Sequence, residues 1–78
     1  MENAQNKINK LIDKYKYRIT IQEYRMLMTL LRYRLLLDFK EEINEYGIKR
    51  LVGYNLEREL IYTRIIVKDE RKWQVKKH

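Results

Sequence analysis

The residue types that carry most catalytic and metal-binding chemistry are scarce in this chain of 78 residues. It has no cysteine, its single histidine is the last residue, and Gly47 and Gly53 are its two glycines. The lack of cysteine excludes disulfide frameworks, thiolate zinc sites and thiol catalysis. Glu23 and Glu41 each stand three residues after a Thr or Asp, as in helix caps, so a structural role accounts for them. We therefore expect no enzyme, no cofactor and no metal.

Positive charge is the chemistry that the sequence offers in quantity. Eighteen Lys and Arg residues stand against 11 Asp and Glu, a formal net charge of +7. A field of this size attracts nucleic acid, an anionic membrane or an acidic protein. The cations concentrate in residues 7–18 and 71–78, whereas residues 41–45 are acidic. We expect folding to assemble the basic surface from distant segments.

Length and hydropathy predict one small domain over residues 1–78. With 45% hydrophobic residues the chain can bury a small core, but the margin is thin, so a second copy is an expected partner. The start of the chain has no apolar signal region, and no apolar run approaches the roughly 18 residues of a membrane span. The sequence thus predicts a soluble, cytoplasmic protein without a membrane partner.

The first half of the chain predicts two amphipathic helices. Over residues 3–17, Ile8, Ile12 and Tyr15 recur at helical spacing. The second helix, over residues 20–33, opens with a capping box between Thr20 and Glu23. It is apolar on two sides, which share helical spacing: Tyr24, Leu27, Met28, Leu31 and Leu35 on one, and Met26, Leu30, Tyr33 and Leu37 on the other. Such a helix is central to the core or also packs on a partner.

A short extended break and a further helix are predicted next. Residues 34–37 (RLLL) are expected to be extended, because Asp38 and Glu41 then repeat the cap pattern. Gly47 is expected to end the new helix as its C′ residue. A single uninterrupted helix over residues 21–46 is the alternative.

The last third of the chain predicts a helix and then a hairpin. Apolar residues recur every four positions, which predicts a helix over about 50–60: Ile48, Val52, Leu56 and Leu60. From residue 61 onward the β-branched run IYTRIIV, the charged turn KDERK and the run WQV predict a hairpin over residues 61–76.

The segments TIQEYRMLMTLL, INEYGI and LIYTRIIVKDERKWQV, in this order, resemble a winged helix-turn-helix DNA-binding domain. The resemblance covers residues 20–77, with residues 3–17 as an extra N-terminal helix. It implies a mainly α fold with a small C-terminal β-hairpin. It also implies a small basic transcriptional regulator that binds double-stranded DNA sequence-specifically as a homodimer.

The resemblance further implies which residues contact DNA. The helix over 50–60 would lie in the major groove, where Arg and Asn suit bidentate contacts with guanine and adenine edges. Its outward residues are Lys49, Arg50, Tyr54, Asn55 and Arg58. The wing would contact phosphate through Lys68, Arg71 and Lys72, which fixes register without reading sequence. The dimer would use the N-terminal helix and the second apolar side of helix 21–33.

Other interpretations stay open. An all-α helical hairpin or bundle would suit an adaptor protein of a phage or mobile element that binds an acidic protein partner. A ribbon-helix-helix domain would use KYKYRITI as its strand, although about 26 residues separate that strand from Gly47, which is long for its first helix. The arginines at 50, 58 and 64 also have acids close by in sequence, with which they would pair on a solvated surface.

Overall fold

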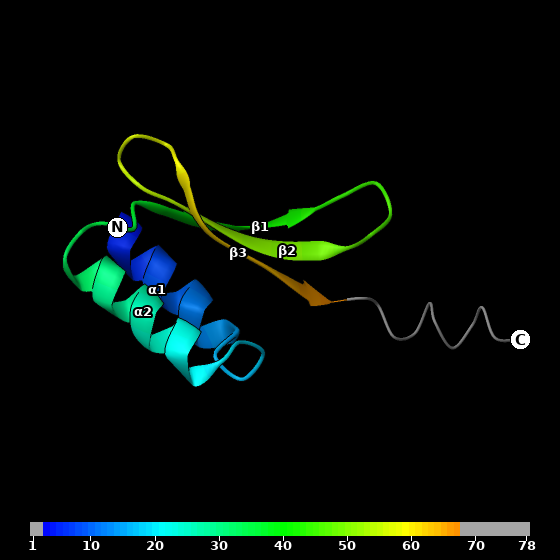
Figure 1. Cartoon of the computed structure of the whole chain (residues 1–78), viewed down its shortest axis with the longest axis horizontal. Helices are drawn as coiled ribbons and strands as arrows, with labels where there is room; N and C mark the ends of the chain where they lie inside the picture. Colours follow the sequence, from blue (N-terminus) through cyan, green and yellow to red (C-terminus); the bar gives the residue numbers. More distant parts are fainter. Residues whose placement is uncertain (1–2, 68–78) are drawn as a thin grey trace, which may run out of the picture.

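The computed structural model describes residues 3–67 and has two layers (Figure 1). Two helices, α1 (Ala4–Lys14) and α2 (Ile21–Arg32), lie against one face of an antiparallel sheet. The sheet contains β1 (Asp38–Ile43), β2 (Lys49–Tyr54) and β3 (Leu60–Val67) in the order β1-β2-β3, so neighbours in sequence are neighbours in space. The described chain is therefore an α+β protein with its sheet on the C-terminal side.

The predicted N-terminal helix is confirmed as α1. Asn3 caps it, because its side-chain oxygen accepts a hydrogen bond from the Asn6 amide at 2.8 Å. Ile8 and Ile12 are buried on its inner side, and Tyr15, which follows the helix, is only 6% exposed. The spacing of four residues thus turns one side of the helix onto the core.

The predicted helix at 20–33 and its capping box are confirmed as α2. Thr20 Oγ accepts from the Glu23 amide at 3.0 Å, and the Glu23 carboxylate accepts from the Thr20 amide at 2.9 Å. At the other end of α2, the Leu35 amide donates to the Leu30 carbonyl at 2.8 Å. The Arg34 amide donates to the Leu31 carbonyl at 3.1 Å. These two bonds form a Schellman motif with Arg34, at φ 60°, in the left-handed position. The predicted break after this helix is therefore confirmed.

The sheet has a helix-facing side and an outer side, which alternate along each strand. On β2, Leu51 and Gly53 face the helices, and their partners across the ladders are Glu41 and Phe39 on β1, and Arg64 and Tyr62 on β3. The outer side carries the residues in between: Asp38, Lys40 and Glu42 on β1, and Arg50, Val52 and Tyr54 on β2. Most of these outer side chains are exposed or half-buried, whereas Val52 is buried, at 1% exposure.

The core lies between the two layers. Its buried residues come from both helices, their connections and all three strands: Ile8, Ile12, Tyr15, Ile19, Leu27, Leu31, Leu36, Phe39, Leu51 and Tyr62. Arg64 of β3 also reaches the Glu23 carboxylate of α2 at 2.6 Å, which ties α2 to the sheet at the border of the core. The two layers thus form one unit.

The predicted fold class is wrong in the middle of the chain. Residues 38–43 and 49–54 are strands, where helices were expected, so neither the winged helix-turn-helix nor the all-α alternative describes this fold. A repeat of four residues is compatible with a helix, but it is also two periods of a strand. In the structure Val52 is the one member of that repeat on β2, since Ile48 and Leu56 lie in the flanking turns and Leu60 begins β3. Antiparallel pairing on both sides of β2 stabilises the extended conformation.

The two hairpin turns share one construction. Residues 44–48 and 55–59 each begin with an asparagine whose amide donates to the carbonyl four residues on, at 3.1 Å in both turns. The fourth residue is left-handed in both, Gly47 at φ 77° and Arg58 at φ 62°. The left-handed backbone that Gly47 was expected to supply is present, but it closes a hairpin and does not end a helix.

Candidate nucleic-acid interface

Two of the predicted DNA contacts, Arg50 and Tyr54, lie on the outer side of the sheet. Arg50 is exposed, and its guanidinium is 3.5 Å from the Glu42 carboxylate. The Lys40 ammonium lies 5.4 Å from the centre of the half-buried Tyr54 ring. Both cations on this part of the sheet therefore have partners within the protein.

Lys49 lies on the opposite, helix-facing side, so its predicted role as a DNA contact has no support from its position. Its ammonium donates to the Tyr15 hydroxyl at 3.4 Å. That hydroxyl in turn donates to Glu41, which also accepts from Lys14 at 3.2 Å. The Tyr15 hydrogen bond, followed by the nearby lysines, holds the pKa of Glu41 below its ordinary value of 4.5 against the opposing effect of burial. Lys49 thus belongs to a polar cluster beside α1.

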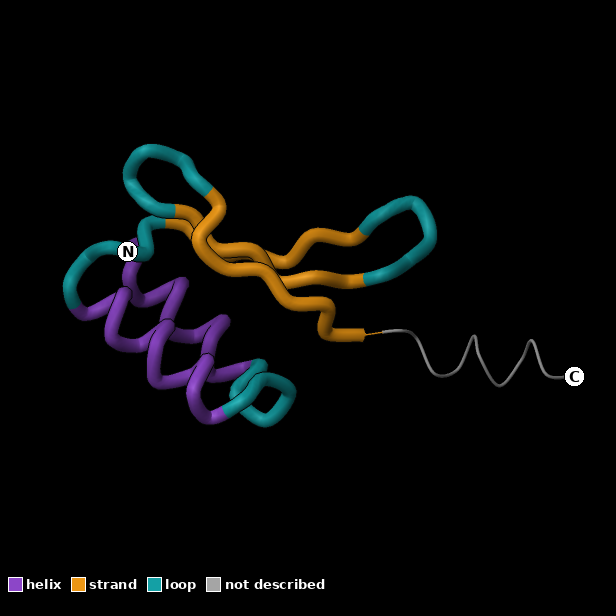
Figure 2. Tube along the Cα trace, viewed as in Figure 1, coloured by secondary structure: helices purple, strands orange, loops and turns teal. Residues whose placement is uncertain are grey.

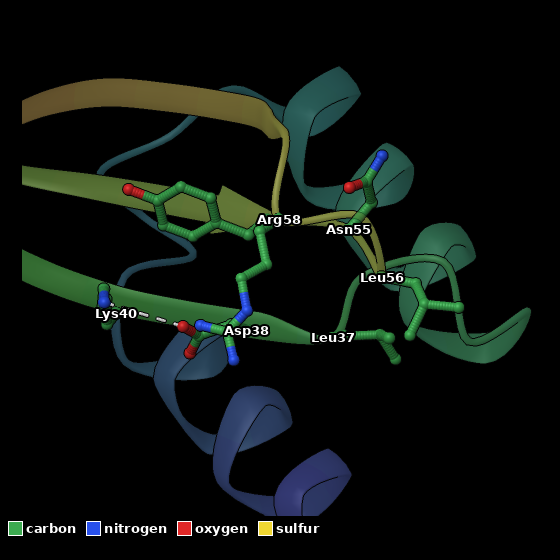
Figure 3. A pocket seen from close by; sticks show the side chains of 7 residues that line it. Leu37, Asp38, Lys40, Asn55, Leu56 and Arg58 are labelled. Atoms are coloured by element: carbon green, nitrogen blue, oxygen red, sulfur yellow. Dashed lines mark ion pairs between the residues drawn. The ribbon is translucent and has the colours of Figure 1, made fainter.

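Asn55 and Arg58 belong to the turn between β2 and β3, not to a helix. The Asn55 side-chain oxygen accepts from the Glu59 amide at 2.9 Å, and its side-chain nitrogen donates to the Glu59 carboxylate at 3.0 Å. Both polar atoms of this side chain therefore stabilise the turn. Arg58 reaches from this turn toward β1, where Asp38 and Lys40 form an ion pair of 3.7 Å (Figure 3). Asn55 is therefore occupied, while Arg58 lines an open hollow.

The predicted wing contacts Lys68, Arg71 and Lys72 lie outside the described residues. The structure therefore brings Tyr54, Asn55 and Arg58 together around the hollow in Figure 3, with Arg50 further along the outer face. None of these four residues lies on a helix.

Charge is divided between the two layers of the fold. Residues 3–37 carry eight Lys and Arg side chains against two acids, whereas residues 38–67 carry five against six. Within the described chain, Lys40, Arg50 and Arg64 form ion pairs. The helix layer therefore supplies most of the basic surface, and the sheet is close to neutral.

An exposed polar stripe runs along α2, on the side away from the core. Gln22, Arg25, Thr29 and Arg32 follow one another at intervals of three, four and three residues, and all four are exposed. At 3.6 residues per turn these intervals place them on one face of the helix. Met26, 41% exposed, and Tyr33, 66% exposed, border the stripe. We call Gln22, Arg25, Thr29 and Arg32 the α2 stripe.

Unpaired arginines distinguish this stripe from the sheet. Within residues 3–67, Arg25 and Arg32 form no ion pair, and neither does Arg18 before α2 or Arg34 after it. Lys16 is exposed beside Arg18, and its ammonium lies 5.2 Å from the centre of the Tyr17 ring. Basic side chains therefore stand at both ends of α2 as well as along it.

The single acid of α2, Glu23, is turned away from the stripe and engaged elsewhere. Burial alone would raise its pKa, but the hydrogen bonds from Thr20 and the charge of Arg64 outweigh burial, so the pKa lies below its ordinary value. Tyr62 lies next to it, and burial, followed by the Glu23 charge, raises the Tyr62 pKa to about 12. The Tyr62 hydroxyl is buried and has no hydrogen-bond partner among the described residues.

The sequence contained a signal for the α2 stripe. In the segment IQEYRMLMTLLR, Gln, Arg, Thr and Arg occur at intervals of three, four and three residues, and none of the four is acidic. Comparison with family models, curated protein sequences and solved structures found no match. No helix within residues 3–67 has the length and apolar character needed to cross a membrane.

Proposed function

We propose that the protein binds double-stranded DNA by placing α2 in the major groove. The observation that carries this proposal is the α2 stripe, an exposed row of two arginines, one glutamine and one threonine without an acid. Arg pairs with guanine edges, Gln pairs with adenine edges, and Thr contacts either. The stripe therefore has the side chains that read base edges, on the side of α2 that faces away from the core.

The dimensions of α2 fit this role. Its 12 residues make a helix roughly 18 Å long, and the major groove of B-form DNA, about 12 Å wide, admits an α-helix. A-form RNA has a deep, narrow major groove that side chains do not enter. DNA duplex is thus the better partner for this stripe.

The basic residues at the ends of α2 supply the backbone contacts. Lys16 and Arg18 precede the helix and Arg34 follows it, and all three are exposed. A helix that spans the groove brings its two ends toward the phosphates on either side. Neutralising these phosphates releases counterions, so the affinity should fall steeply with salt.

A charge-matched pair of double variants tests the proposal. Arg25→Ala/Arg32→Ala removes two cations from the stripe, and Arg50→Ala/Arg58→Ala removes two from the sheet side. Fluorescence anisotropy with a labelled pool of random 20-base-pair duplexes should show a loss of tenfold or more for the stripe variant, since a hydrogen bond from a charged group contributes about 1.5–3 kcal/mol and tenfold in affinity is about 1.4 kcal/mol. The sheet variant should stay within about threefold of wild type, which is roughly the effect of exposed charge alone.

Three results would contradict the proposal. The first is no duplex binding by the wild-type protein at low salt. The second is an equal or greater loss in the sheet variant, which would move the interface to the outer side of the sheet. The third is equal affinity for an RNA duplex of the same length. The sequence also predicts a homodimer through the N-terminal helix and the second apolar side of α2, which borders the α2 stripe at Met26 and Tyr33. Sedimentation of the protein with and without duplex distinguishes DNA binding from dimer formation.

A further inference from the structure

The end of α2 and the β2–β3 turn lie at the same end of the molecule (Figure 2). Both the segment that follows α2 and this turn carry exposed leucines. Leu35 follows α2 and is 54% exposed, Leu37 precedes β1 and is 38% exposed, and Leu56 in the turn is 74% exposed. A single exposed leucine is ordinary, but several that line connected hollows indicate an interaction site. We call Leu35, Leu37 and Leu56 the leucine patch.

Two hollows meet at Leu56. One, of about 500 Å³, is lined by Leu30, Leu35, Leu56 and Ile61, with Arg34 and Glu57 beside them. The other, of about 560 Å³, is the hollow of Figure 3, where Leu37 and Leu56 lie with Tyr54, Asp38, Lys40 and Arg58. Both share Asn55 and Leu56, and each is of the size that accepts apolar groups from a ligand or partner. The patch therefore offers two adjacent apolar sites.

Backbone hydrogen bonds hold the leucine patch in place. The Leu35 amide donates to the Leu30 carbonyl at 2.8 Å, and the Leu37 amide donates to the Tyr54 carbonyl at 3.0 Å. Leu56 sits in the turn that Asn55 closes through its side chain. Because these segments are already ordered, little conformational entropy would be lost when a partner binds.

The charges around the patch favour an acidic occupant over a second copy of the chain. Arg34 and Arg58 line the hollows and form no ion pair within residues 3–67, while Asp38 is already paired with Lys40. Glu57 is the one other acid in the linings. A chain of net charge +7 repels its own copies and attracts acidic segments.

We infer that the leucine patch binds an amphipathic, acid-rich segment of another protein. Two apolar side chains of that segment, about one helical turn apart, would enter the two hollows. Acidic side chains on its flanks would meet Arg34 and Arg58. This surface includes no residue of the α2 stripe and shares only Arg34 with the proposed phosphate contacts, so the inference does not depend on DNA binding.

A peptide selection tests the inference. Random 16-residue peptides displayed on phage are selected on immobilised wild-type protein, and bound peptides are then measured against Leu35→Ser/Leu56→Ser. Enriched peptides should share two apolar residues three or four positions apart and an excess of Asp and Glu. Their affinity should fall at least tenfold in the leucine variant, and likewise in Arg34→Glu/Arg58→Glu.

The control variant is Ile43→Ser/Tyr46→Ser, which removes equally exposed apolar groups, 64% and 75% exposed, from the far end of the β1–β2 hairpin. It should bind the selected peptides as the wild type does. Duplex DNA affinity of Leu35→Ser/Leu56→Ser should remain unchanged, which separates this test from that of the α2 stripe. The inference is wrong if nothing is enriched over the leucine variant or if the enriched peptides carry no acidic excess. It is also wrong if sedimentation shows a wild-type dimer that this variant abolishes.

Discussion

Arg58 occupies a backbone conformation that glycine adopts more easily. Its φ is 62°, and the equivalent position of the other hairpin turn is Gly47 at φ 77°. A non-glycine residue in the left-handed region destabilises the folded chain by about 1–2 kcal/mol. Glycine avoids this strain, but it loses more conformational entropy on folding, which offsets part of the gain. The two turns thus compare both residue types in the same setting.

Arg58→Gly is therefore expected to raise the free energy of unfolding by about 0.5–1 kcal/mol. Urea denaturation measures the change. Arg58→Ala is the control, because it removes the same charge and keeps the left-handed strain, so it should give no increase. Equal stabilities for the two variants would show that strain at this position is negligible.

Gly53 stands where two core side chains approach the backbone of β2. A Cβ atom there would lie 2.8 Å from Leu36 Cδ1 and 3.3 Å from Phe39 Cδ1. Both neighbours are buried side chains, at 1% and 6% exposure, so the core must shift to admit the methyl group.

Gly53→Ala should lower the free energy of unfolding by about 1–2 kcal/mol, since overpacking outweighs the entropy that alanine removes from the unfolded chain. Thermal or urea unfolding of the single variants and of Gly53→Ala/Leu36→Val measures the coupling. Gly53→Ala should destabilise the protein less in the Leu36→Val background, because the shorter valine frees space beside the new methyl group. Purely additive effects would rule out this contact as the cause.

At the scale of elements, α2 depends on its cap for a defined first turn. Thr20 satisfies the Glu23 amide, and Glu23 satisfies the Thr20 amide while it holds Arg64 of β3. The cap therefore connects the helix start with its attachment to the sheet. Positioning of the α2 stripe relies on both.

Thr20→Ala should cost about 1 kcal/mol of stability, because the Glu23 amide loses its acceptor. Thr29→Ala is a suitable control for chemical denaturation, since Thr29 is an exposed position inside the helix where alanine is the better helix former. A Thr20→Ala variant as stable as the wild type would show that solvent replaces the cap without loss.

At the scale of the whole molecule, the carboxylates of Glu23 and Glu41 and the phenols of Tyr15 and Tyr62 link stability to pH. The pKa values of Glu23 and Glu41 lie below 4.5 in the folded chain, so the unfolded chain takes up protons first as the pH falls. Their contribution is fully present above about pH 4.5 and is lost as the pH falls through the folded pKa values. The Tyr62 pKa is raised to about 12 from 10.0, so its contribution is present below pH 10 and is lost as the pH rises toward 12.

Urea denaturation across the pH range should thus show a plateau between about pH 5.5 and 9 with a decline on both sides. Glu23→Gln/Glu41→Gln should flatten the acid side, and Tyr62→Phe should reduce the alkaline decline, to which Tyr15 also contributes because burial raises its pKa. Tyr62→Phe should cost little at pH 7, because the hydroxyl it removes is buried without a hydrogen-bond partner in the described chain. An unchanged acid limb in the double Gln variant would contradict the assigned role of these carboxylates.

The sequence alone was sufficient for features that depend on neighbours along the chain. Both helices, the Thr20 capping box, the break after α2 and the left-handed Gly47 follow from residues within one or two turns of each other. The net charge and the absence of cysteine chemistry follow from composition. Local hydrogen bonds and side-chain spacing decide such features, so they can be predicted without knowledge of the fold.

Only the tertiary structure decided that residues 38–54 form two strands. The four-residue repeat through Val52 suits a helix and a strand alike, and pairing of β2 with both β1 and β3 selects the strand. Pairing also decides which charges remain free, since Arg50 meets Glu42 across a ladder and Arg64 meets Glu23 across the two layers. Contacts between residues distant in sequence thus moved the candidate DNA-binding surface from residues 49–58 to α2.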